Sequence, residues 1–114
     1  MKSGPKKSRE ALFLKWVVRR KDERYLVEDL DLDEVIVSRT TLFPGKSTRG
    51  HSYENQEAYV FINSATLTLD FVDRIVEEGQ TVVVSEDVHH RVFNKSNANT
   101  VFYNMWMKKK GLAK

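Results

Sequence analysis

The sequence predicts an all-β fold, a sandwich or a barrel, and three observations lead to this prediction. Many short segments are rich in β-branched and aromatic residues, turn-forming residues separate them, and no segment shows a long 3.6-residue period. In chain order the segments are ALFLKWVV, RYLVEDL, EVIVSRTTLF, EAYVFI, ATLTLDFV, TVVVS, HRVFN and TVFYNMWM. Turn signals occur at Pro44-Gly45, Asn63-Ser64 and Glu78-Gly79. A closed arrangement of such strands would also cover their edges.

The chain of 114 residues is long enough for one domain with a sizeable core and too short for two. Residues 1–9 combine glycine, proline, serine and charge without an apolar period, so we expect a disordered basic arm there. The β-domain is predicted for residues 10–107. Residues 108–114 are predicted to form a basic C-terminal tail.

Charge is distributed unevenly along the chain. Eight of the 19 basic residues lie at the two ends, four in residues 1–9 and four in residues 108–114. Subtracting these eight leaves 11 basic residues against 16 acidic ones in the body, a net charge of −5. Basic ends on an acidic body are typical of solvated tails rather than of a groove for a phosphate backbone. We therefore expect no nucleic-acid partner.

No apolar run approaches the length of about twenty residues that a membrane-spanning helix needs. The lysine-rich start is not followed by the apolar stretch of a secretory signal. The sequence therefore predicts a soluble, cytoplasmic protein with no membrane partner. It contains no cysteine, so any metal site must use histidine, carboxylate or phenol ligands.

Alternation along the strands indicates how they are covered. In EAYVFI, one side carries Glu57, Tyr59 and Phe61, and the other side is apolar too. TVVVS and TVFYNMWM are likewise apolar on both sides. Since a small barrel has one interior, the outer apolar side needs a second cover, most simply another subunit. We predict a homodimer.

Three reactive side chains stand close together in the segment GHSYENQE. His51 and Tyr53 are two residues apart, so they would point to the same side of an extended chain. Glu57 follows across a tight turn and can join them. These residues predict a common cavity.

A further histidine comes from VHHRVFN, where two adjacent histidines must point to opposite faces. His90 shares a face with Val92, whereas His89 shares one with the charged Arg91, so His90 is the inward histidine. With His51 and Glu57 it makes a set of two imidazoles and one carboxylate. Such sets hold Fe, Mn, Ni or Zn while leaving positions open for a substrate.

Two segments resemble the two sequence motifs of the cupin superfamily. Residues 45–64, GKSTRGHSYENQEAYVFINS, resemble G(x)5HxH(x)3,4E(x)6G, with Tyr53 at the second histidine and a serine at the closing glycine. Residues 79–94, GQTVVVSEDVHHRVFN, resemble G(x)5PxG(x)2H(x)3N, with Ser85 and Asp87 replacing the proline and the glycine. The chain resembles small single-domain cupins, and more loosely the cupin-type sugar-phosphate isomerases.

This resemblance implies a double-stranded β-helix, or jelly-roll barrel, with one metal ion bound in typical members by three histidines and one glutamate. By position, the metal ligands would be His51, Glu57 and His90. Tyr53 stands where the second histidine is expected. It would be a metal ligand, an acid or base beside the metal, or a replacement that leaves three protein ligands. A metal-free barrel is the alternative.

The same resemblance implies action on a small sugar or sugar phosphate, of the isomerase or epimerase kind. Tyr53 and Tyr59 are the candidate proton-transfer residues, and Lys46 and Arg49 are the candidate ligands of a substrate phosphate. Two alternatives stay open. One is a metal-free or non-catalytic cupin that binds a small carbohydrate or carboxylate ligand, and the other is a metal-dependent lyase or dioxygenase.

Overall fold

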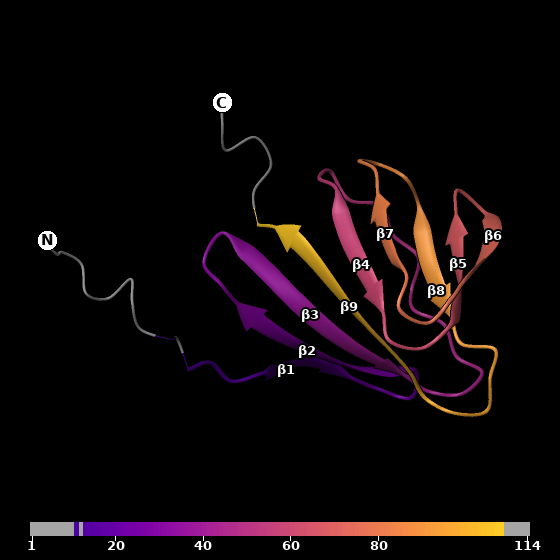
Figure 1. The fold of residues 1–114 in the computed structure, drawn as a ribbon, viewed down its shortest axis with the longest axis horizontal. Coiled ribbons are helices and arrows are strands. Elements are labelled where there is room, and N and C mark those ends of the chain that lie inside the picture. Colours follow the sequence, from indigo (N-terminus) through magenta and orange to yellow (C-terminus); the bar gives the residue numbers. More distant parts are fainter. Residues whose placement is uncertain (1–10, 12, 109–114) are drawn as a thin grey trace, which may run out of the picture.

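A computed structural model describes residue 11 and residues 13–108, and this part of the chain forms nine β-strands and no helix (Figure 1). The strands are β1 Val17–Lys21, β2 Tyr25–Asp31, β3 Val35–Leu42, β4 Glu57–Phe61, β5 Ala65–Leu69, β6 Val72–Val76, β7 Thr81–Val84, β8 His90–Phe93 and β9 Thr100–Met107. The prediction of an all-β fold is confirmed.

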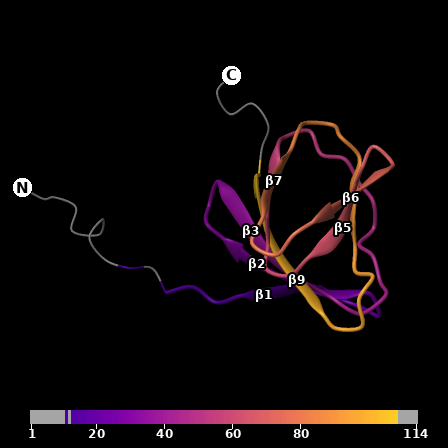
Figure 2. The same ribbon diagram turned by 45° about the vertical axis from the view of Figure 1, so that its right-hand side comes forward.

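All strand pairs are antiparallel and form two sheets. Six strands lie in the order β1-β2-β3-β9-β4-β7, and three lie in the order β6-β5-β8. β9 pairs with both β3 and β4, so the last strand of the chain lies at the centre of the larger sheet. Figure 2 shows the strands of the two sheets curving around a common axis.

One predicted strand is in fact the start of a hairpin. The segment ATLTLDFV, residues 65–72, ends its first strand at Leu69 and turns through Asp70 and Phe71, whose φ angles are 47° and 69°. Two consecutive residues with positive φ make the kind of tight turn that matches the twist of the flanking strands. β6 then returns against β5. The sequence lacks the glycine that usually marks such a turn, so the prediction of one strand was wrong.

The first strand also differs from its prediction. The segment ALFLKWVV covers residues 11–18, but β1 begins only at Val17 and continues to Lys21. The β2 partner residues 26–29 fix this position, because strand pairing needs a neighbour as well as an apolar sequence. The predicted arm, residues 1–9, and most of the predicted tail lie outside the described residues.

The two cupin-like segments keep the backbone conformation that their motifs imply. Gly45 and Gly79 have φ angles of 74° and 83°, in the left-handed region that favours glycine. Asp87 stands where the second motif has its glycine, and its φ is 63°. Aspartate tolerates this region better than most residues, so the turn is retained although the glycine is absent.

The core lies between the inner faces of the two sheets. Phe61 is fully buried, and its ring centroid lies 5.4 Å from that of Phe102 and 6.1 Å from that of Tyr59. The other buried apolar residues are Tyr25, Val27, Leu42, Ala65, Leu67, Val76, Val84 and Val92. The aromatic cluster of Tyr59, Phe61 and Phe102 therefore supports one side of the interior.

Asn94, the last residue of the second cupin-like segment, has a structural role. Its amide nitrogen donates hydrogen bonds to the carbonyls of Leu42 and Ala98, at 2.9 and 2.8 Å. Its side-chain oxygen accepts a bond from the backbone N–H of Ser96 at 3.0 Å. Since Asn94 is buried, these bonds satisfy groups that water does not reach. They join the loop between β8 and β9 to the end of β3.

No helix in the described part of the chain is long and apolar enough to cross a membrane. The cytoplasmic location expected from the sequence stays a prediction.

Candidate metal centre

The inner faces of the strands enclose a cavity of about 350 Å³, a size that suits a small-molecule ligand. Its lining residues are Arg19, Arg20, Tyr25, Val27, Thr40, Thr48, Arg49, Gly50, His51, Tyr53, Glu57, Tyr59, His90, Val92, Phe102, Asn104 and Trp106. The sequence prediction that His51, Tyr53, Glu57 and His90 share one cavity agrees with this lining.

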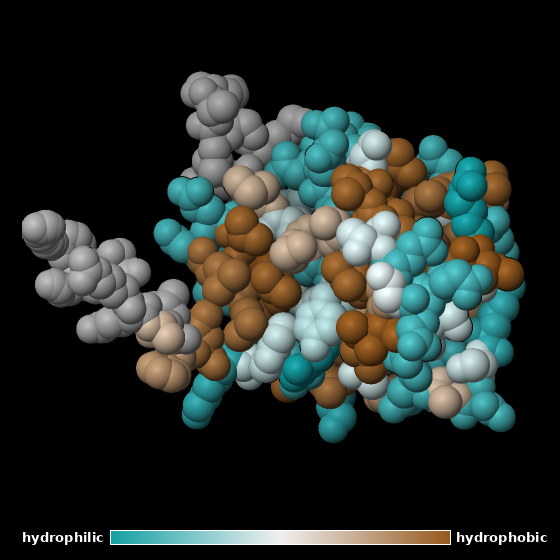
Figure 3. All heavy atoms as spheres, in the orientation of Figure 1, coloured by the Kyte–Doolittle hydropathy of each residue, from teal (hydrophilic) through white to brown (hydrophobic). Residues whose placement is uncertain are grey.

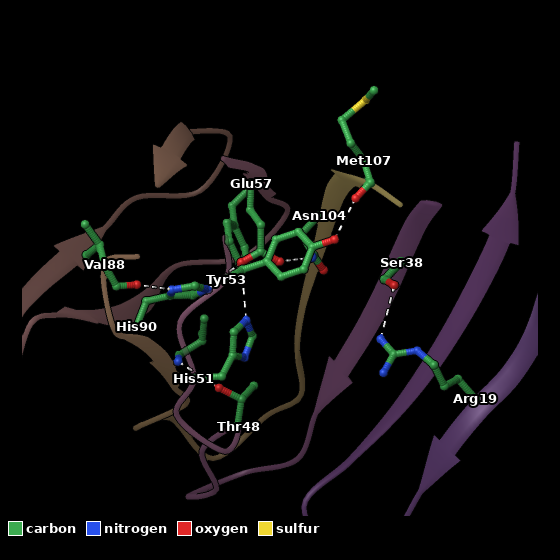
Figure 4. Close-up of polar contacts among 12 residues, drawn as sticks. Arg19, Ser38, Thr48, His51, Tyr53, Glu57, Val88, His90, Asn104 and Met107 are labelled. Carbon is green, nitrogen blue, oxygen red and sulfur yellow. Dashed lines mark hydrogen bonds and ion pairs between the residues drawn. The ribbon is translucent and has the colours of Figure 1, made fainter. Parts of the chain in front are cut away.

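An isolated backbone bridge brings the two histidines together. The N–H of His51 donates to the carbonyl of His90 at 3.1 Å, and the N–H of His90 donates to the carbonyl of His51 at 2.8 Å. Glu57 is the first residue of β4 and points into the same space. Figure 4 shows the three side chains turned toward one another. One ligand atom from each lies within 4.8 Å of the others.

The hydrogen bonding of His90 leaves one nitrogen for a metal. Its Nδ1 lies 2.8 Å from the carbonyl oxygen of Val88, so in the neutral ring Nδ1 carries the proton and Nε2 carries a lone pair. Nε2 is buried and lies 2.6 Å from Oε1 of Glu57. Two acceptors face each other there unless a proton or a cation lies between them. The residues therefore fit a metal ion.

His51 completes the group from the open side. Its Nε2 lies 3.3 Å from Oε1 of Glu57, and its side chain is 52% exposed, whereas those of Glu57 and His90 are 5% and 2% exposed. Glu57 and His90 are therefore enclosed by the barrel, whereas His51 faces the open side of the group.

The ionisation of the group follows from its contacts. Burial by itself raises the pKa of Glu57, but hydrogen bonds and Coulombic attraction from His51 and His90 outweigh it and lower this pKa to about 2. Burial lowers the pKa of His90, whereas the bonds to Glu57 and to the Val88 carbonyl raise it, and the net direction is upward. Without a metal, the pair is a carboxylate and an imidazolium at pH values below the raised pKa of His90.

The two candidate tyrosines lie in different surroundings. Tyr59 is buried, its hydroxyl is 3.5 Å from Oε1 of Glu57, and burial, reinforced by that carboxylate, raises its pKa well above 10. Tyr53 is half-buried, and its hydroxyl donates to the carbonyl of Met107 at 2.6 Å. In Figure 4 this hydroxyl points away from the three candidate metal-binding side chains.

The two candidate phosphate ligands are separated by the structure. Arg49 lines the cavity and pairs with Asp22 at 3.0 Å. Lys46 is exposed and does not line the cavity.

Sequence reasoning missed five polar lining residues, which are Arg19, Arg20, Thr40, Thr48 and Asn104. Asn104 donates to Oε2 of Glu57 at 3.3 Å, and alternation along TVFYNMWM places it inward with Phe102, which is a signal that was present. Arg19 and Arg20 also line the cavity. Simple alternation would have placed these neighbours on opposite faces.

Gly50 allows a close approach beside the centre. A Cβ atom at this position would lie 2.5 Å from Cε1 of His89, closer than packed atoms come. His89 is half-buried, and its ring stacks on Phe71 at 4.7 Å between centroids. A side chain at position 50 would therefore displace either this ring or the loop that carries His51.

Comparison with known proteins identifies the fold. No protein-family model matches the sequence, and none of the curated proteins matches it. Among solved structures, a cupin 2 conserved barrel domain protein from Salinispora arenicola superimposes with a TM-score of 0.72 at 20% identity, covering 87% of this chain and 91% of that one. The chain has the cupin fold. A Klebsiella pneumoniae protein with a double-stranded β-helix domain superimposes with a TM-score of 0.72 at 14% identity, covering 82% and 84% of the two chains.

A third similar cupin carries a functional description. It is a sugar phosphate isomerase from a cupin superfamily in Silicibacter pomeroyi, with a TM-score of 0.68 and 17% identity, covering 76% of this chain and 61% of that one. At such identities these similarities establish the jelly-roll barrel and leave the activity open.

Proposed function

We propose that this cupin binds one divalent transition-metal ion through His51, Glu57 and His90, and isomerises or epimerises a small sugar or sugar phosphate in the cavity. The observation that carries the proposal is the convergence of two imidazoles on one carboxylate: Nε2 of His90 lies 2.6 Å, and Nε2 of His51 lies 3.3 Å, from Oε1 of Glu57. Two imidazoles and a carboxylate suit Fe, Mn, Ni or Zn.

The chain's own residues would prepare the site. A bound ion would act as a Lewis acid that polarises a carbonyl or hydroxyl oxygen of the substrate. Asn104 holds the second oxygen of Glu57, which fixes the carboxylate plane. Tyr59 keeps its proton, because its pKa is raised, and acts as a donor near Glu57. Tyr53 is the other candidate proton-transfer residue; it lines the cavity, but its hydroxyl donates to the carbonyl of Met107, so it can act on a substrate only after that bond breaks.

Metal content tests the proposal first. Protein purified without an affinity tag or chelator is expected to contain close to one metal ion per chain, and His90→Gln is expected to contain little. His89→Gln is the matched control, since His89 is adjacent in sequence but packs on Phe71 outside the three-ligand group. Elemental analysis measures the metal in all three proteins.

The outcome also separates the alternatives. Metal that falls only in His90→Gln supports the proposal and directs substrate screening to sugar phosphates first. If all three proteins stay metal-free after incubation with each candidate ion, the metalloenzyme proposal is wrong, and the metal-free carbohydrate-binding cupin takes its place. A metal-loaded protein that is inactive on sugars but acts on carboxylates would favour the lyase or dioxygenase alternative.

The homodimer also belongs to this proposal. Apolar side chains are exposed on outward positions of the larger sheet, where Val83 is 57% and Met105 is 40% exposed. Figure 3 shows groups of apolar side chains, in brown, on one face of the molecule. Covering such a surface favours self-association. Light scattering during gel filtration is expected to give twice the mass of 13.3 kDa, and a monomer mass at all concentrations would contradict the dimer.

A further inference from the structure

A β-bulge turns two neighbouring arginines toward the same cavity. In the β1–β2 pair, Val18 lies opposite Glu28 and Arg20 lies opposite Val27, so Arg19 is an extra residue without a partner of its own. In a regular strand, adjacent side chains point to opposite faces. The bulge changes this rule locally, and both arginines line the cavity.

The carboxylates that pair with these arginines are not part of the cavity lining. Arg19 pairs with Asp29 at 2.7 Å, and Asp22 pairs with Arg49 at 3.0 Å and with Arg20 at 3.8 Å. Neither aspartate lines the cavity, whereas all three arginines do. Three arginines share two aspartates, so this wall presents net positive charge to the cavity.

These guanidinium groups keep donors for a ligand. A guanidinium has five N–H donors, and a single carboxylate oxygen occupies one or two of them. Arg19 is fixed further by lying 5.6 Å from the centroid of the Trp106 ring. The side chains of Arg20 and Arg49 are 48% and 51% exposed, so an incoming anion reaches them without displacing buried groups.

The surface between this wall and the metal-ligating residues is partly polar. Thr40 and Asn104 both line the cavity there, and both are buried hydrogen-bonding side chains. Trp106 and Tyr25 add aromatic surface. Polar groups interspersed with aromatic rings suit the hydroxyl groups and the C–H faces of a small sugar-like ligand.

We propose that Arg19, Arg20 and Arg49 form an oxyanion subsite, which binds a phosphate or carboxylate group of the ligand whose other end lies at His51, Glu57 and His90. The subsite rests on the proposed function only for this second contact. The subsite implies that the substrate is a small hydroxylated anion. Arg19 and Arg20 then bind the anion together with Arg49, in the role that the sequence analysis gave to Lys46. Asp22 competes with the bound anion for Arg20 and Arg49.

The test uses anions too small to depend on the identity of the sugar. Inorganic phosphate and acetate are titrated into the full chain, metal-free and zinc-loaded, at constant ionic strength with chloride as the reference. The Nε–H signals of Arg20 and Arg49 in NMR spectra are expected to shift saturably with at least one of the two anions. The anion that binds more tightly distinguishes a phosphate subsite from a carboxylate subsite.

Three variants are expected to change anion affinity in different ways: one weakens it, one tightens it and one leaves it unchanged. The double variant Arg20→Gln, Arg49→Gln is expected to weaken anion binding by about tenfold or more, because two charge-assisted contacts are lost. Asp22→Asn is expected to tighten it severalfold, because the competing charge is removed while the amide oxygen still accepts the backbone bond from Arg24. Arg39→Gln is the matched control: Arg39 pairs with Glu28 at 3.1 Å and does not line the cavity.

The results separate the subsite from the metal centre. Zinc binding with no anion effect, or a double variant that binds as tightly as wild type, overturns the subsite and leaves the proposed function standing. Anion binding that depends on Arg20 and Arg49 in a protein that binds no zinc supports the subsite and refutes the metal centre. Equal weakening in Arg39→Gln would show a general charge effect and also overturns the subsite.

Discussion

Replacing Glu57 with glutamine is expected to weaken zinc binding by about 100-fold or more. Glutamine has nearly the same shape, so the barrel can keep its packing, but it removes the negative charge that faces both histidines. Oε1 of Glu57 lies 2.6 Å from Nε2 of His90 and 3.3 Å from Nε2 of His51. Loss of a charged ligand between two imidazoles removes the largest attraction for a cation.

Calorimetric titration of zinc into the metal-free protein measures this loss. Glu28→Gln is the matched control, because Glu28 pairs with Arg39 away from the cavity, and it should bind zinc as wild type does. A Glu57→Gln protein with unchanged zinc affinity would show that Glu57 is not a ligand.

The same pair gives the metal-free protein a pH dependence that Glu57→Gln should reduce. Because the pKa of His90 is raised, the stabilisation is fully present below 6.5 and is lost as the pH rises through the folded value. Because folding lowers the pKa of Glu57 from 4.5 to about 2, the stabilisation by the charged carboxylate is present above pH 4.5 and is lost as the pH falls from 4.5 to about 2. Zinc affinity should instead rise with pH, since zinc competes with the proton on His90. Thermal unfolding midpoints with and without zinc measure both trends, and parallel trends would contradict this assignment.

The candidate metal ligands could be predicted because short-range geometry positions them. His51 and Glu57 are close in sequence. The neighbours of His90 indicate that this histidine points inward, which agrees with its exposed fraction of 2%. The step from these residues to one cavity used strand alternation, and the resemblance to the cupin motifs then implied the same three ligands. Alternation and spacing are local properties, and the sequence carries them directly.

The grouping of Arg19, Arg20 and Arg49 on one wall of the cavity could not be predicted, because it depends on a register shift in the β1–β2 pair. No residue near Arg19 in the sequence indicates that this position has no pairing partner in β2. Similarly, Lys46 and Arg49 both precede His51 by a few residues, yet only Arg49 lines the cavity. The turn at Asp70 and Phe71 was missed for a related reason, because aspartate and phenylalanine adopt positive φ there without a glycine to signal it. Strand pairing decides the first two cases, whereas the turn is a local conformation within the β5–β6 hairpin.

Phe61→Ala is expected to lower the free energy of unfolding by about 3–5 kcal/mol, a large share of the total for a domain of this size. The side chain of Phe61 is fully buried against Phe102 and Tyr59, and a rigid barrel can collapse only partly into the space it leaves. Denaturant unfolding monitored by circular dichroism measures the change. Phe71→Ala is the matched control, because Phe71 is 79% exposed, and we expect it to cost less than about 1 kcal/mol.

The Phe61 variant also shows whether the core and the metal centre are separable. Phe61 does not line the cavity, whereas its neighbours Tyr59 and Phe102 do. If the folded variant keeps the zinc affinity of wild type, the aromatic cluster contributes stability while the bridge between His51 and His90 holds the ligands in place. If zinc affinity falls together with stability, Tyr59 has moved, and the position of Glu57 depends on core packing as well as on strand pairing.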